Sequence, residues 1–219
     1  FFQNPDDVKV FTDNKIISAD SVVMLNGSGV NLNRFKLVPL PEKRVFLCVS
    51  RLIRDKGVGE YLQAAKSVKE SFPEVRFLLV GPYDTNPSAL TPEELKPYID
   101  DGVIEYFGEQ MDVRPYLAEC SIFVLPSYRE GTPKAVLEAM ACGRAVLTTD
   151  APGCRETVID GENGYLVPVK DVSALVRRME ELIQDPGSVK KMGASGRKLV
   201  EEKFDVDKVN DTICRAMGV

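Results

Sequence analysis

Residues 129–150, REGTPKAVLEAMACGRAVLTTD, form the stretch that decides the fold. The pattern predicts a loop, then a helix that begins near Pro133 and ends at Gly143, and then a strand at residues 145–149. An apolar run at residues 121–125 predicts another strand just before the loop. Two short strands separated by one helix are typical of a parallel pair joined by a helical crossover.

The same alternation continues on both sides of this stretch. Further strands are expected at residues 44–50, 75–80, 103–107 and 164–167. Further helices are expected at residues 57–71 and 113–120, and from Thr91, Asp171, Gly187 and Asp205. Strands that alternate with helices favour right-handed crossovers and a parallel sheet covered on both faces. We therefore predict an α/β fold with a doubly wound parallel sheet, in which ligands bind at the carboxyl ends of the strands.

Composition narrows the class of protein. The chain has 219 residues, 44% hydrophobic and 28% charged, which is typical of a globular protein. A net charge of −5 argues against nucleic acid or an anionic membrane surface as a general partner. No apolar run approaches the roughly 20 residues of a transmembrane segment, so none is expected. Five widely spaced cysteines indicate reduced thiols in a cytosolic protein, with disulfides left as the less favoured alternative.

Histidine is absent from the sequence. Its absence excludes Ser-His-Asp triads, Cys-His dyads and metal sites with histidine ligands. Any chemistry in this chain must use carboxylates, basic side chains and backbone dipoles, or groups supplied from elsewhere.

Two glutamates stand eight positions apart around the start of the predicted helix. Glu130 lies on the glycine-bearing loop, and Glu138 lies off the apolar stripe of the helix, which is formed by Ala135, Val136, Ala139 and Met140. Helical side chains lean towards the N-terminus, which would aim Glu138 at the loop. With Thr132 as its cap, this helix start could hold a phosphate. The alternatives are ordinary surface pairs, Glu130 with Arg129 and Glu138 with Arg144.

Other strand ends carry weaker candidates. Arg51 and Lys56 follow the strand at residues 44–50, and two cations beside a helix N-terminus suit a diphosphate. They could equally be solvated loop charges. Gly81 and Gly108 follow the next two strands, where a glycine lets backbone approach a flat ring but serves a turn equally well.

These blocks together resemble the C-terminal half of a family 4 glycosyltransferase. Such enzymes are retaining transferases of the GT-B fold, in which two Rossmann-like domains face each other across a cleft. The resemblance rests on residues 51–56, 127–150, 153–157 and 160–167, and it covers nearly the whole chain. Bacterial transferases that build capsular, lipopolysaccharide or protein-linked glycans are the most similar members.

The resemblance implies a domain organisation. Residues 1–30 are expected to be the tail of a truncated N-terminal domain and the interdomain connection, with helical periodicity at residues 6–17 and a short strand at residues 22–25. Residues 31–203 are expected to form the Rossmann-like domain that binds the nucleotide sugar. Residues 204–219 are expected to form a helix that packs back towards the N-terminal domain.

The resemblance also implies a role for each matching residue. Arg51 and Lys56 would neutralise the donor diphosphate, and Glu130 would hold the sugar hydroxyls, which makes these three the expected catalytic residues. Glu138 would bind both ribose hydroxyls. The sugar and distal phosphate would be cradled by the backbone of Gly131, Thr132, Pro133 and Lys134. The base would contact Gly81, Phe107, Gly108 and Glu109. Many members have Gly-Phe/Leu-Gly after the first glutamate, so the Gly-Thr-Pro found here leaves the donor-sugar contacts open.

We therefore expect transfer of a hexosyl unit, with retention, from a nucleotide sugar to a glycan or lipid-linked acceptor. The donor is expected to be a UDP-sugar, and the acceptor would bind the missing N-terminal domain. No metal or other cofactor is expected, because the Asp-x-Asp at residues 205–207 opens a helix as a cap. The expected location is the cytoplasm, with a peripheral place at the inner membrane open for the full-length protein. Two alternatives remain: an isolated donor-binding module that is inert alone, or a sugar-nucleotide epimerase of the same fold.

Overall fold

A computed structural model describes residues 1–218, and in this part of the chain the sheet has six strands, all parallel. In chain order the strands are β1 (Val45–Val49), β2 (Arg76–Val80), β3 (Glu105–Tyr106), β4 (Ile122–Leu125), β5 (Ala145–Thr149) and β6 (Gly164–Val167). Their order across the sheet is β3-β2-β1-β4-β5-β6. The predicted doubly wound α/β fold is confirmed, although β3 is shorter than the strand expected at residues 103–107.

Both faces of the sheet are covered, because the central strands are apolar on both sides. All residues of β4 and β5 are buried, as expected for parallel strands between two layers of helices. One face carries Phe46 of β1, which pairs in register with Phe77 of β2 and stacks on its ring at 5.0 Å. The opposite face carries Leu47 of β1 and Phe123 of β4. The core is therefore two apolar layers that the sheet separates.

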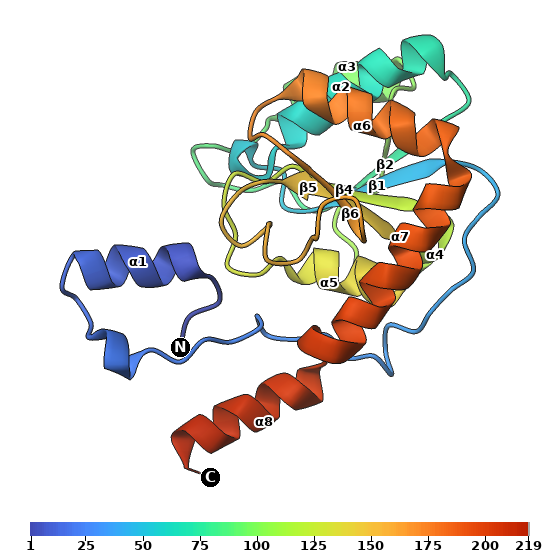
Figure 1. The fold of residues 1–219 in the computed structure, drawn as a ribbon. Coiled ribbons are helices and arrows are strands. Elements are labelled where there is room, and N and C mark those ends of the chain that lie inside the picture. The colour runs from blue at the N-terminus through green and yellow to red at the C-terminus, as the bar shows by residue number, and fades with distance from the viewer. Residues whose placement is uncertain (219) are drawn as a thin grey trace.

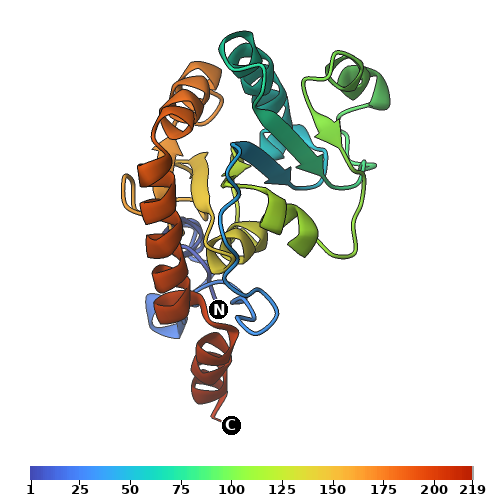
Figure 2. The same cartoon turned by 90° about the vertical axis from the view of Figure 1, so that its right-hand side faces the viewer.

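The helices divide between these two layers (Figures 1 and 2). The Phe46 layer is closed mainly by α2 (Val58–Ser71), α3 (Pro92–Asp100) and α6 (Val172–Gln184). The Phe123 layer is closed by α4 (Arg114–Glu119) and α5 (Lys134–Ala141). The long helix α7 (Pro186–Leu199) contacts β5 and α5 and continues into a π-helical turn, η3 (Val200–Phe204).

Several helix ends have the caps that the sequence predicts, and one predicted cap is wrong. Thr91 caps α3 in a capping box with Glu94, and Asp205 caps the last helix, α8 (Val206–Met217). Gly143 has a φ of +78°, the left-handed conformation predicted for the end of α5. The prediction that Thr132 caps α5 is wrong, because the N-cap residue is Pro133 and no side chain caps this helix. The Thr132 hydroxyl instead donates to the carbonyl oxygen of Gln3 at 3.4 Å.

The two chain ends lie on the same side of the sheet domain (Figures 1 and 2). Near the N-terminus, α1 (Pro5–Asp13) ends earlier than the helix expected at residues 6–17 and is followed by a 3-10 turn, η1 (Ala19–Ser21). The strand expected at residues 22–25 is wrong as a strand, because its pairing is limited to an isolated bridge between Phe2 and Met24. None of the helices within residues 1–218 combines the length and the hydropathy that a membrane crossing needs.

Candidate functional site

The site expected from the sequence lies where the strand order reverses. Strands β1 and β4 are neighbours in the sheet, and β2 and β5 lie on their outer sides. The loops that leave β1 and β4 at their carboxyl ends therefore diverge and leave a crevice, the usual ligand position in such sheets. A cavity of about 120 Å³ opens there, lined by Val49, Ser50, Lys56, Leu125, Glu130, Pro133, Lys134 and Ala135.

An ion pair crosses this cavity. The Lys56 ammonium donates to a Glu130 carboxylate oxygen at 2.5 Å, with side-chain exposures of 21% and 12%. Lys56 ends a 3-10 turn, η2 (Arg54–Lys56), just before α2. The alternative pairing of Glu130 with Arg129 is wrong, because Arg129 contacts Asp7 instead. The structure thus brings together two of the three predicted catalytic residues.

Ser127 ties the two loops of this ion pair together. Its buried hydroxyl lies 3.1 Å from the carbonyl oxygen of Asp55, the residue before Lys56, to which the Tyr128 amide also donates at 2.8 Å. A Cβ at Gly57 would stand 2.0 Å from the Pro126 carbonyl oxygen, so only glycine permits this approach. These contacts fix the relative position of the loops that carry Lys56 and Glu130.

Arg51, the third predicted catalytic residue, lies apart from the ion pair. Its side chain is 56% exposed and pairs with Asp84 at 2.9 Å. It is not among the residues that line the cavity. The two cations that the sequence places on one loop therefore separate, since Lys56 enters the crevice while Arg51 stays at the surface.

Glu138 stands one helical turn beyond Lys134 and is half-buried. Within residues 1–218 no hydrogen bond or ion pair reaches its carboxylate. Burial raises the pKa of Glu138, an effect that the positive charges of Lys134 and Arg34 partly offset. The alternative pairing with Arg144 is wrong, because Arg144 is fully buried and donates to the carbonyl oxygens of Leu117 and Pro39 at 2.8 and 3.2 Å. Glu138 is thus an acceptor available to a ligand.

The residues predicted to contact the base lie along the ends of β2 and β3. The Gly81 amide donates to the Gly108 carbonyl oxygen at 2.8 Å, which joins the two loops. A Cβ at Gly81 would stand 1.8 Å from the carbonyl oxygen of Ser50, so this glycine allows a close approach to the cavity wall. The Phe107 ring lies 4.8 Å from the ring of Tyr116, and Glu109 is exposed.

Gly153 lies close against the backbone of the loop that carries Glu130. A Cβ at Gly153 would lie 2.1 Å from the Glu130 carbonyl oxygen and 2.5 Å from that of Gly131. Sequence reasoning assigned no role to Gly153 or Ser127. The local signal at Ser127 is a hydroxyl directly after a buried strand, and the local signal at Gly153 is a glycine in a loop. Each signal is found in ordinary turns as often as in a functional site.

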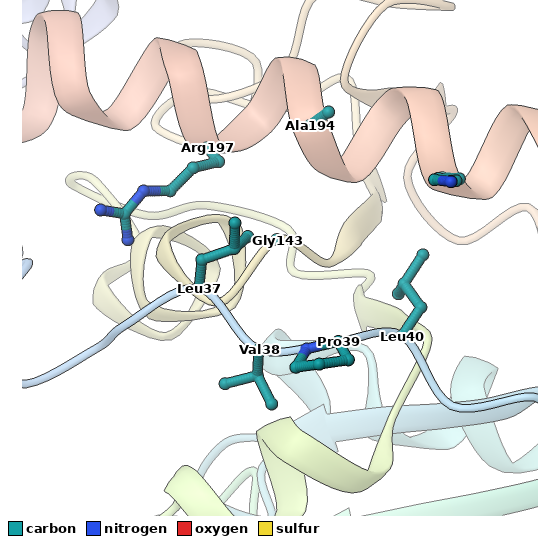
Figure 3. Close-up of a pocket in the computed structure, with 8 residues that line it drawn as sticks. Leu37, Val38, Pro39, Leu40, Gly143, Ala194 and Arg197 are labelled. Atoms are coloured by element: carbon teal, nitrogen blue, oxygen red, sulfur yellow. The ribbon is translucent and has the colours of Figure 1, made fainter.

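A second cavity lies at the opposite edge of the sheet and contains none of the predicted site residues. Its volume is about 770 Å³, and it separates residues 37–40 from α7 (Figure 3). Its wall is mainly apolar, and the guanidinium of Arg197 on α7 is already bonded to the carbonyl oxygens of Phe35 and Ala141 at 3.1 and 2.7 Å. This chemistry does not suit a nucleotide sugar.

Residues 30–199 of the chain match the family of glycosyl transferases group 1. The chain belongs to this family. Its relatives include an N,N'-diacetylbacillosaminyl-diphospho-undecaprenol alpha-1,3-N-acetylgalactosaminyltransferase of Campylobacter jejuni, 31% identical over 189 residues that cover 80% of this chain and 48% of that protein. The capsular polysaccharide biosynthesis glycosyltransferase CapM of Staphylococcus aureus is 31% identical over 71% of this chain and 41% of its own length. This group 1 chain thus spans about half the length of the curated relatives it matches.

Solved structures of glycosyltransferases share the fold. A sucrose-phosphate synthase from Thermosynechococcus elongatus matches with a TM-score of 0.82 at 25% identity, over 98% of this chain and 56% of its own. Anabaena HepE, in complex with UDP and glucose, matches with a TM-score of 0.84 at 20% identity, over 99% of this chain and 62% of its own. The group 1 chain therefore has the Rossmann-like α/β fold of GT-B glycosyltransferases, and its relatives build bacterial capsular and surface glycans.

Proposed function

We propose that this chain is the donor-binding half of a retaining hexosyltransferase that uses a UDP-sugar. The observation that carries the proposal is the Lys56–Glu130 ion pair in the crevice between β1 and β4. A cation for the diphosphate and a carboxylate for the sugar stand there side by side. The complexes of Anabaena HepE with UDP and with UDP-glucose support the choice of donor.

Donor binding would exchange the internal ion pair for contacts with the ligand. The diphosphate takes the Lys56 ammonium, and the sugar hydroxyls donate to the Glu130 carboxylate. Because Glu138 has no partner in residues 1–218, its two oxygens are available for the ribose hydroxyls. Gly81, Phe107, Gly108 and Glu109 then form the wall against the base.

The start of α5 supplies further donors to the ligand. The first amides of a helix have no partner within the helix and favour a negative charge. In this chain α5 begins at Lys134, so those amides belong to Lys134 and Ala135, because the N-cap residue Pro133 has none; the Gly131 and Thr132 amides lie in the loop just before them. We propose that Gly131, Thr132 and Lys134 hold the distal phosphate and the sugar through their backbone.

Charge on the departing nucleoside diphosphate is stabilised by Lys56, and by Arg51 once it leaves Asp84. A preorganised cation that meets developing charge contributes several kcal/mol, on the order of 3 kcal/mol for one donor. Both cations are provided by side chains, so the proposal requires no metal ion. Retention then follows when the acceptor attacks the face from which the diphosphate leaves.

The acceptor is a glycan or a lipid-linked glycan, bound by the part of the enzyme outside this chain. The undecaprenol-linked acceptor named for the Campylobacter jejuni relative supports this class. The 219-residue chain alone would then bind donor but transfer no sugar. Five free cysteines, four of them buried, support a reducing compartment, and we propose the cytoplasm.

Calorimetry with UDP, GDP and ADP tests the proposal. We expect UDP to bind most tightly, and Glu138→Ala to weaken UDP about 10- to 100-fold, as for loss of hydrogen bonds to a charged group. Glu162→Ala is the matched control, since Glu162 is an exposed loop glutamate. Failure of all three nucleotides to bind, or equal affinity in wild type and Glu138→Ala, would contradict the donor site. Binding should also persist in a chelator.

A further inference from the structure

Asn4 is the feature of the N-terminal segment that the proposed function leaves unexplained. It is fully buried, while every other residue of 1–26 is half-buried or exposed. A buried amide is costly unless its polar atoms are bonded. The bonds of Asn4 therefore indicate what it holds.

Only one of the two polar groups of the Asn4 side chain caps a helix. The Oδ1 atom accepts from the Asp7 amide at 2.8 Å, which is the ordinary N-cap of α1. The Nδ2 group donates to the Asp7 carboxylate at 2.9 Å and also faces the carbonyl oxygens of Glu130 and Gly131, at 3.3 and 3.4 Å. A helix cap needs no contact with a distant loop, yet Glu130 and Gly131 follow Asn4 by 126 and 127 residues in the sequence.

The neighbours of Asn4 contact the same loop. The carbonyl oxygen of Gln3 accepts from the Thr132 hydroxyl at 3.4 Å, and a Cβ at Gly131 would lie 2.6 Å from the Gln3 side-chain oxygen. Asp7 pairs with Arg129. Residues 3–7, which we call the clasp, thus lie against residues 129–132, and Gly153 also lies close to the Glu130 and Gly131 carbonyls.

The clasp has a geometric consequence for the donor site. A trans peptide is planar, so its carbonyl and the following N–H point in opposite directions. Because the Glu130 and Gly131 carbonyls face Asn4, the amides of Gly131 and Thr132 point away from it. No acceptor within residues 1–218 takes either amide, so both are available to a ligand.

We propose that Asn4 is a positioning residue for the donor: it orients the Gly131 and Thr132 amides towards the distal phosphate and fixes the backbone that carries Glu130. The proposal rests on the proposed donor site and extends it to a residue outside the sheet domain. Contacts with ribose and base, which depend on Glu138 and on the ends of β2 and β3, are independent of the clasp.

The test compares UDP with UMP, which lacks the distal phosphate. Asn4→Ser keeps a hydroxyl that can cap α1 but removes the Nδ2 donor. We expect its UDP affinity to fall about ten-fold, the loss of one charge-assisted hydrogen bond, while its UMP affinity stays within about two-fold of wild type. Asn14→Ser, at the exposed C-terminal end of the same helix, should change neither affinity.

The outcomes separate the two proposals. If wild type binds neither nucleotide, the donor site itself is wrong. If wild type binds UDP more tightly than UMP and Asn4→Ser keeps that ratio, the positioning role of Asn4 is overturned. Amide NMR of the wild-type chain needs no variant: the Gly131 and Thr132 resonances should shift with UDP and stay in place with UMP. Equal shifts with both nucleotides would also overturn the role.

Discussion

Lys56 and Glu130 form a 2.5 Å ion pair although 74 residues separate them in the sequence. Each end belongs to a different loop at the carboxyl edge of the sheet, one after β1 and one after β4. Each side chain satisfies the other's charge, which keeps a half-buried ammonium and carboxylate from standing alone. In the proposed donor complex, the diphosphate and the sugar hydroxyls take the place of these two partners.

Lys56→Met tests the contribution of the Lys56–Glu130 ion pair to stability and the contribution of Lys56 to UDP binding. The variant leaves the Glu130 carboxylate, 12% exposed, without its cation, so we expect the free energy of unfolding to fall by about 1–3 kcal/mol. UDP affinity should fall at least ten-fold, because the diphosphate loses a charged donor. Urea unfolding and calorimetry measure the two effects.

The control for this variant is Lys66→Met, which removes an exposed lysine of α2 and should change neither quantity. The double variant Lys56→Met with Glu130→Gln should recover most of the lost stability but none of the UDP affinity. If the two single changes were simply additive in unfolding free energy, the ion pair would not contribute to the folded state.

Glu138→Gln should stabilise the free protein while it weakens UDP binding. Burial raises the folded pKa of Glu138 above its ordinary value of 4.5. The contribution of this group to stability is therefore fully present below that ordinary value and is lost as the pH rises through the folded pKa. At pH 7 the buried charge is a cost that glutamine removes.

Thermal unfolding at pH 4 and pH 7 measures this effect. The Tm gain of Glu138→Gln over wild type should be larger at pH 7 than at pH 4, where the wild-type carboxyl is already protonated. Glu162→Gln, on an exposed loop, gives the baseline. An equal gain at both pH values would contradict the assignment of a penalty to the charge of Glu138.

Gly153→Ala should damage the site through the backbone of its neighbours. Alanine at a φ of +83° costs roughly 1–2 kcal/mol in any location, and its Cβ would also lie 2.1 Å from the Glu130 carbonyl oxygen. Gly161→Ala is a matched control, since its φ is +80° but nothing lies within 4 Å of the added Cβ. Gly153→Ala should lower the unfolding free energy by more than the control and weaken UDP, whereas the control should leave UDP affinity unchanged.

The five cysteines should differ sharply in reactivity. Cys214 is exposed, and the other four are buried. Burial raises the pKa of Cys48 and of Cys120 to about 12, so neither forms a thiolate at neutral pH. A thiol reagent should modify one cysteine in the folded protein and five in denaturant. Cys214→Ser should abolish the native reaction; any fast reaction left in that variant would show that the core opens.

The fold was predictable because buried parallel strands are nearly continuous apolar runs. β4 and β5 have this form, and turn residues bound them on both sides. The order of the strands across the sheet is a property of long-range packing, which no local period encodes. The end of α5 at Gly143 was predictable from a local signal of the same kind. The start of α5 was predicted one residue too early, because Pro133 has an extended ψ of 107° and the helix begins at the next residue.

The sequence predicted which residues form the site better than it predicted which side chains pair with one another. Glu130 and Glu138 were expected to face a ligand, but their local alternatives, Arg129 and Arg144, were wrong because both arginines are engaged elsewhere. Arg51 and Lys56 were grouped because they are close in sequence. Asn4 could not be found by such reasoning, since its partners follow it by 126 and 127 residues.

The central position of the β1–β4 pair has a consequence for how the protein folds. Phe46 and Ile122, which are aligned across these strands, can meet only after a long loop has closed, and such contacts are slow to form. The β1–β2 unit can assemble earlier because its strands are closer in sequence. During refolding, recovery of UDP binding should therefore coincide with the last cooperative step, and a partly folded chain will carry half a sheet and no donor site.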